Sequence, residues 1–194
     1  NLLGNSSTGL SSGIEKFFNA VQQVADNPSS QAARQSLISQ SDSLVNNFQY
    51  VNDAINQQYG QVNTAIKNSV SQINALAQNI ADLNGKIVLA TGAASGGTSN
   101  DLLDQRDTAL TNLAKLVAVT TVKQDNGAVN VLIGNGQSLV VGSQTQTLSI
   151  VSNKYDPTRY EVGYASGGSG NVEISGQLSG GSLGGLLNFR NQVL

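Results

Sequence analysis

The sequence predicts an α+β protein in which a long helical rod or bundle carries a small antiparallel β domain. Two observations lead to this fold class. Apolar residues between positions 29 and 90 recur with the period of a helix, whereas short β-branched runs between 118 and 178 alternate with glycine-rich turns. The helical period returns at the end of the chain. We therefore predict a helical rod domain over residues 1–117, joined by residues 182–194 as the start of a returning helix, and a β domain over 118–181.

A first helix is predicted from Ser11 or Ser12 to Asp26. Its apolar face is formed by Ile14, Phe17, Phe18, Val21, Val24 and Ala25. Asn27 is a suitable N-cap for the next helix, and Pro28 suits the first helical turn because that turn needs no amide donor. The pattern predicts a sharp turn and a helical hairpin.

The second helix is predicted from Ser29 to Ala90, with no proline inside its stripe. The stripe recurs with a mean step of about 3.6 residues, the helical period. At about 1.5 Å per residue the helix is about 90 Å long, which exceeds the diameter of about 40 Å expected for a compact domain of this size. We expect a rod, since the stripe crosses Gly60 without changing phase. The stripe positions are Leu44, Phe48, Val51, Ile55, Tyr59, Val62, Ile66, Ser69, Ile73, Leu76, Ile80, Leu83 and Ile87.

Beyond a glycine-rich loop, a third helix is predicted to end near Val117. Turn signals at Asp125-Asn126-Gly127, Gly134-Asn135-Gly136 and Asp156-Pro157 then divide a series of short strands. The predicted strands are 119–122, 129–133, 139–141, 145–151, 159–164 and 172–174. A last helix opens at 180–182. The three shorter helices are together too short to cover the long stripe, so further covering surface is expected from chain beyond Leu194 or from a neighbouring subunit.

Composition excludes several classes of function. The net charge is −2 and the basic residues are scattered, so we expect no nucleic-acid partner. There is no apolar run long enough to span a membrane, and no cysteine for disulfides or thiol chemistry. Charged residues are only 11% of the chain, against about 25% in an ordinary domain, so the polar surface is largely uncharged amide and hydroxyl groups.

No motif in the chain predicts catalysis or a cofactor. Histidine, the commonest general base and metal ligand, is absent. Gly180-Gly181-Ser182-Leu183-Gly184 matches the spacing of a hydrolase nucleophile elbow, but that site needs a preceding strand and a histidine. We interpret it as a glycine-rich link that opens a helix. We expect no enzyme, no cofactor and no metal.

One group of charges requires an explanation. Asp101, Asp104, Arg106 and Asp107 share the third helix, yet none has an opposite charge three or four residues away. They are solvated surface, or Arg106 is held by an acid outside its helix or in another subunit, or the carboxylates perform acid–base chemistry. We single out Asp104, Arg106, Asp107 and, in the last helix, Arg190 as candidate structural or subunit-contact charges.

Three ordered segments resemble the family of bacterial flagellar hook-associated protein 1, the first hook–filament junction protein. The most characteristic runs from Asn100 to Asp107 and reads NDLLDQRD, followed by Leu110 and Leu113. The entry into the long helix, at 17–20 and 27–34, and the return to a helix at 181–190 are similar too, as is the β segment 131–141.

The resemblance implies a flagellin-like plan of long helices with inserted β domains, here as an internal fragment. It implies a structural protein that is exported by the flagellar type III route and joins hook to filament by subunit packing. The implied partners are other copies of the protein, the hook protein, the second junction protein and an export chaperone for the full-length protein. The implied location is the extracellular flagellum.

Two alternatives remain open. The chain is another flagellin-like axial protein, such as the second junction protein or flagellin, although the motif at 104–107 argues against flagellin. The second alternative is a surface-exposed adhesin or carbohydrate-binding module that uses the β region. Sugar stacking would need more aromatic residues than Tyr155, Tyr160 and Tyr164, the only tyrosines of that region, which argues against this alternative.

Overall fold

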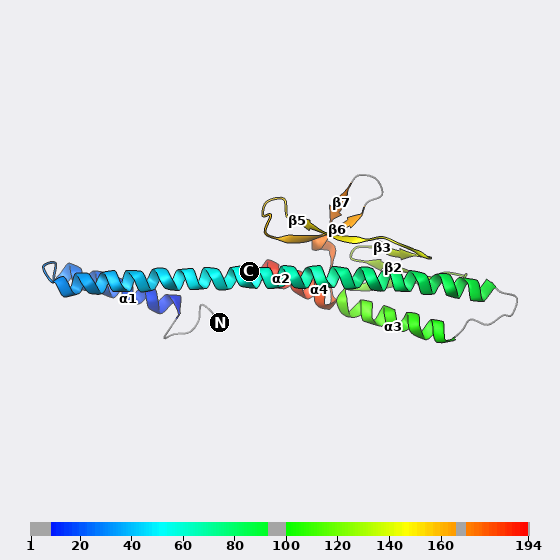
Figure 1. Cartoon of the computed structure of the whole chain (residues 1–194), viewed down its shortest axis with the longest axis horizontal. Coiled ribbons are helices and arrows are strands. Elements are labelled where there is room, and N and C mark those ends of the chain that lie inside the picture. The colour runs from blue at the N-terminus through cyan, green and yellow to red at the C-terminus, as the bar shows by residue number, and fades with distance from the viewer. Residues whose placement is uncertain (1–8, 93–99, 166–169, 194) are drawn as a thin grey trace. The chain divides into compact units, whose positions relative to one another are not determined.

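A computed structural model describes residues 9–92, 100–165 and 170–193. The described helices are α1 (Leu10–Asp26), α2 (Gln31–Gly92), α3 (Asn100–Leu116) and α4 (Gly181–Gln192), with a short 3-10 helix, η1 (Ser175–Gln177). The strands are β1 (Val119–Lys123), β2 (Val129–Ile133), β3 (Gln137–Val141), β4 (Gln144–Thr145), β5 (Leu148–Ser152), β6 (Tyr160–Ala165) and β7 (Asn171–Glu173), as Figure 1 shows. The predicted α+β class, with long helices and small antiparallel sheets, is confirmed.

The chain divides into two compact units, residues 1–58 and 59–194. The first contains α1 and the beginning of α2, which form the predicted helical hairpin. Its turn differs from the prediction in two respects. Pro28 lies in the turn between the helices and not in the first turn of α2, which begins at Gln31. Asn27 ends α1 as its C-cap, and the helix start is capped by Ser30, whose Oγ accepts a hydrogen bond from the backbone amide of Ala33 (3.2 Å). A serine directly before the helix competes better for this role than an asparagine three residues further away.

In the second unit, the predicted stripe of α2 is buried except at Tyr59 and Leu76, which are half-buried. Its buried face is wider than the predicted stripe, because a second column of residues lies beside it. The whole face consists of Val62, Asn63, Ile66, Ser69, Val70, Ile73, Ala77, Ile80, Ala81, Leu83, Asn84 and Ile87. In the first unit, by contrast, the stripe residues Phe48 and Ile55 are exposed, at 50% and 37%. The apolar stripe of α2 is therefore core only in its second half.

The β region contains two antiparallel sheets, with strand orders β1-β2-β3-β4 and β5-β6-β7. The prediction of a single strand over 145–151 was wrong. Pairing with β3 ends where the Gln146 amide donates to the carbonyl of Leu139 (2.9 Å), and the chain then enters the second sheet at Leu148. The Asn74 side chain binds both backbone groups of Leu148, so this residue is held by α2 at the break between the sheets.

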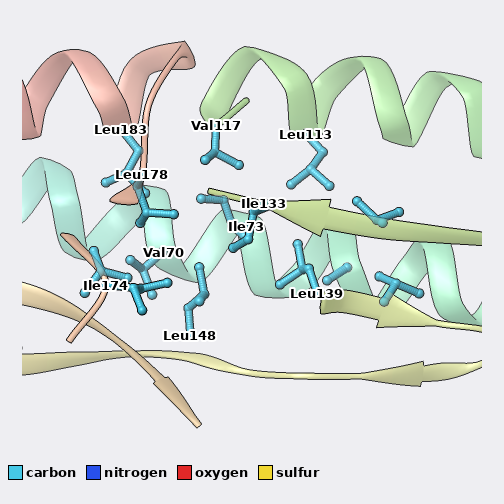
Figure 2. Packing of buried hydrophobic residues seen from close by; sticks show 14 of the residues in the cluster. Val70, Ile73, Leu113, Val117, Ile133, Leu139, Leu148, Ile174, Leu178 and Leu183 are labelled. Atoms are coloured by element: carbon cyan, nitrogen blue, oxygen red, sulfur yellow. The ribbon is translucent and has the colours of Figure 1, made fainter. Parts of the chain in front are cut away.

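One hydrophobic core joins α2, α3, α4 and both sheets in the second unit. Figure 2 shows Leu113, Val117 and Leu183 pointing towards Val70 and Ile73 of α2, with Ile133, Leu139 and Leu148 arriving from the strands. All of these side chains are buried. At roughly 25 cal/mol per Å² of apolar surface, this shared core is the main stabilising contribution in the unit.

The glycine-rich segment before α4 allows two helices to meet end to end. Gly181 has a φ of +56°, and a Cβ added there would lie 2.4 Å from the carbonyl carbon of Leu116, the last residue of α3. The Ala118 amide donates to the carbonyl of Ser179 (2.9 Å) across the same junction. As predicted, residues 180–184 open a helix. What precedes them is a 3-10 turn at 175–177 and not the strand that a nucleophile elbow needs.

Candidate functional site

Three asparagines of α2 bind the backbone of the β region. Asn84 is fully buried and uses its whole amide: Nδ2 donates to the carbonyls of Val129 (2.7 Å) and Gly142 (2.8 Å), and Oδ1 accepts from the Val129 amide (3.1 Å). The side-chain amide of Asn84 thus supplies the hydrogen bonds that a neighbouring strand would otherwise give to the backbone of Val129. These bonds satisfy backbone groups that are buried against the helix.

Asn74 and Asn63 repeat the arrangement along the helix. Asn74 donates to the Leu148 carbonyl (2.8 Å) and accepts from the Leu148 amide (2.9 Å). Asn63 donates to the Thr158 carbonyl (2.7 Å) and accepts from the Tyr160 amide (3.2 Å). Each asparagine therefore meets the chain at or next to the first residue of a strand: β6, β5 and β2 in turn.

Arg106 lies on the buried face of α3, with only 6% of its surface exposed. Its Nη1 donates to Asn84 Oδ1 (3.2 Å) and to the carbonyl of Gly127 (2.7 Å), so it joins α3, α2 and the β1–β2 turn. The expected acidic partner is not found among the described residues bonded to Arg106, since both acceptors are neutral. Burial lowers the pKa of the Arg106 guanidinium, and the charge of Asp107 opposes that shift. The interpretation of the charges on this helix as solvated surface is therefore wrong for Arg106.

Arg190 of α4 is also buried, at 1% exposure, and it pairs with Glu161 of β6. The Arg190 Nη2 donates to Glu161 Oε2 at 2.7 Å, and its Nη1 donates to the carbonyl of Tyr160. The other carboxylate oxygen of Glu161 accepts from Arg159 Nε (2.7 Å) and Asn153 Nδ2 (3.0 Å). This cluster attaches α4 to the three-stranded sheet.

Competing effects act on the Glu161 carboxyl. Burial raises its pKa, but hydrogen bonds from Ser175, Arg190 and Asn153 outweigh the burial, and the charge of Arg190 adds to them. The pKa of Glu161 is therefore lower than usual, and the carboxylate is charged at neutral pH. A buried carboxylate with this many donors is well suited to structure and poorly suited to proton transfer.

Asp104 and Asp107 lie on the opposite, exposed face of α3. Neither belongs to an ion pair within the described residues. Asp104 lines a groove of about 340 Å³ between α2 and α3, together with Leu76, Asn79, Gln105, Thr108, Ala109 and Asn112. The structure thus separates the four candidate charges: it places Arg106 and Arg190 in the interior, and Asp104 and Asp107 on the surface.

In the part of the chain that the structure describes, no three His, Cys, Asp or Glu side chains are placed to hold a metal ion. None of the described helices combines the length and apolarity needed to cross a membrane. The buried polar groups of this unit instead contact its own backbone and side chains.

The asparagine contacts and Glu161 were not predicted from the sequence. Asparagine is common throughout the chain, and the groups bound by Asn63, Asn74 and Asn84 lie 45 to 97 residues away. A helical wheel could have found Asn63 and Asn84, because both lie on the buried face with Val70, Ala77 and Ala81, whereas Asn74 is half-buried at the edge of that face.

These features define a structural helical domain, in which a long helix packs against two small β sheets. Its buried charges join helices to strands within the domain. Over residues 1–194 the chain matches the family described as the flagellar hook-associated protein FlgK helical domain. The chain belongs to this family.

Relatives support the assignment. The chain is 44% identical to flagellar hook-associated protein 1 of Salmonella typhimurium and 43% identical to that of Escherichia coli. These matches cover 100% of this chain and 35% of the Salmonella protein, so the chain spans about a third of the length of the curated relatives. It also matches the flagellar hook junction protein FlgK from Burkholderia pseudomallei, with a TM-score of 0.88 and 32% identity, over 97% of this chain and 34% of that one.

Proposed function

We propose that this chain is the helical packing part of a flagellar junction protein, which joins the hook to the filament through subunit contacts and without catalysis. The observation that carries the proposal is the family match over the whole chain. Arg106 and Arg190 support the proposal because each joins a helix to the β region of the same chain. Such contacts give a structural domain rigidity, whereas an enzyme needs accessible reactive groups.

A chimera tests this function. Residues 1–194 would replace the matching part of E. coli flagellar hook-associated protein 1 in a strain that lacks the native protein. We expect swimming to be restored. The empty strain and a strain carrying the native gene are the two controls. A chimera that is produced and exported at normal levels yet leaves the cells non-motile would contradict the proposal.

The assembled protein would place this chain on the extracellular flagellum, after export by the flagellar type III route. Its partners would be further copies of itself, the hook protein and the second junction protein, with an export chaperone acting on the full-length protein. Within it, residues 1–117 and 182–194 would serve as the helical scaffold and residues 118–181 as the β insertion.

We assign Asp104 and Asp107 to contacts with basic side chains of neighbouring subunits. Both carboxylates are exposed and outside the described ion pairs, whereas the two arginines are used internally. In the chimera, Asp104→Asn with Asp107→Asn should reduce swimming while leaving thermal unfolding unchanged. Glu173→Gln, on the exposed strand β7, is the matched control. Normal swimming of the double variant would contradict the assignment of Asp104 and Asp107 to subunit contacts.

The first unit offers a second surface for packing. The α1–α2 hairpin exposes Phe18 (62%), Ile38 (55%) and Val45 (53%), a large apolar area for two helices. We propose that a further helical segment of the full-length protein or a neighbouring subunit covers it. Replacing the three residues by Ser, Thr and Thr should prevent motility of the chimera without lowering its stability as an isolated chain. Unchanged motility would contradict this covering role.

A further inference from the structure

The buried stripe of α2 repeats itself every seven residues. Ile66, Ile73, Ile80 and Ile87 are each fully buried and face the core of the second unit. A shift of the β region along the helix by seven residues, about 10.5 Å at 1.5 Å per residue, would place isoleucine where isoleucine had been. Apolar burial alone therefore distinguishes poorly between one docking position and the next, as it does in coiled coils with uniform cores.

The asparagine contacts do not share this repeat. Asn63, Asn74 and Asn84 are eleven and ten residues apart, and each satisfies backbone groups at the start of a different strand. After a shift of seven residues, Asn84 would be replaced in its site by Thr91 or Ala77. The carbonyls of Val129 and Gly142 would then lose the amide donors they have now. Val129 is buried and Gly142 is half-buried, and leaving such carbonyls without a donor is disfavoured.

We propose that Asn63, Asn74 and Asn84 are positioning residues that fix the register of the two sheets on α2, while the isoleucines supply most of the attraction. A single polar residue selects register in the same way in helical assemblies with a repeating apolar core. The two sheets are fixed separately, the four-stranded one by Asn84 and the three-stranded one by Asn63 and Asn74.

A disulfide can report the register, because the chain contains no cysteine. A Cβ added at Gly85 lies 3.7 Å from the Ser143 Cβ, within the range of natural disulfides. Ser143→Cys would be combined with Gly85→Cys for the native register, and with Gln78→Cys or Gly92→Cys for registers shifted by one heptad. Each pair would be oxidised in the 194-residue chain, and the crosslinked fraction measured on a gel and by mass spectrometry.

Asn84→Leu should lower the ratio of native to shifted crosslinks at least fivefold, because it removes the contacts of Asn84 with Val129 and Gly142 of the four-stranded sheet. Asn74→Leu should leave this ratio unchanged, because Asn74 binds the other sheet. Asn68→Leu is the control on the exposed face of the same helix. An unchanged ratio in folded Asn84→Leu would overturn the proposal.

Asn84→Asp gives the same test with less disturbance. It keeps an acceptor for Arg106 and removes both donor contacts, so the ratio should again fall. If both Asn84 variants lose their fold and form no shifted crosslink under native conditions, the proposal is also overturned. The asparagines would then supply stability and not register.

Discussion

Arg190 and Glu161 form an ion pair that water hardly reaches, with exposures of 1% each. Removing one partner of such a pair leaves the other charge buried and uncompensated. Arg190→Ala would leave Glu161 with Arg159 as its remaining cation, and Arg159 is itself partly exposed. The loss in the free energy of unfolding should therefore depend on which arginine is removed.

We expect Arg190→Ala to lower the free energy of unfolding by about 3–5 kcal/mol. Arg159→Ala, which removes a partly solvated partner of the same carboxylate, should cost no more than about 1 kcal/mol. Urea denaturation of the two variants and the parent would measure both values. An equal decrease in the free energy of unfolding for the two variants would contradict the prediction that the buried arginine contributes more to stability than the partly exposed one.

The lowered pKa of Glu161 makes stability depend on pH in a defined direction. Because the folded-state pKa lies below the unfolded value of about 4.3, the contribution is fully present above that value and is lost as the pH falls through the folded pKa. The unfolding free energy of the parent should therefore fall with decreasing pH in this acidic range. Glu161→Gln should be less stable at pH 7 and fall less steeply. Parallel curves measured by urea titration from pH 6 to pH 3 would contradict the assignment.

At the scale of elements, periodicity predicted the helices well and the sheets less well. A helical period needs only the chain's own spacing, so both ends of α2 and the C-terminal end of α3 were predicted within two residues of their observed positions. At the break between the two sheets, Leu148 is bound by Asn74 of α2, which is 74 residues away, and no local pattern contains that information. The same holds for Arg106, whose acceptors are 21 and 22 residues away.

The junction between α3 and α4 also depends on backbone proximity. Gly181→Ala would force a left-handed φ on an L-residue and place its Cβ against the end of α3. We expect a loss of at least about 2 kcal/mol in the free energy of unfolding. Gly185→Ala is the matched control, because its Cβ would meet nothing within 4 Å, and it should raise stability by up to about 1 kcal/mol. Thermal unfolding that ranks the two variants equally would contradict this account of the junction.

At the scale of the whole molecule, the buried residues are distributed unevenly between the two units. Of the described hydrophobic residues that are buried, Ala20 alone belongs to residues 1–58, and the rest belong to the second unit. Helices owe most of their stability to packing and not to propensity, so the two halves of α2 should differ in stability although they form one helix.

Hydrogen exchange can compare these halves within a single helix. Amides of residues 38–55 should exchange at least about a hundredfold faster than those of residues 66–87, which corresponds to a difference of about 2.7 kcal/mol in opening free energy. Residues 66–87 open only when the core shared with α3, α4 and both sheets opens, whereas residues 38–55 lie in the first unit, where Ala20 is the one buried hydrophobic residue described. Uniform protection along α2 would contradict the prediction, because it would show that the half with the exposed apolar stripe is as stable as the half in the core. A step in protection near residue 59 would confirm that the first unit is the less stable of the two.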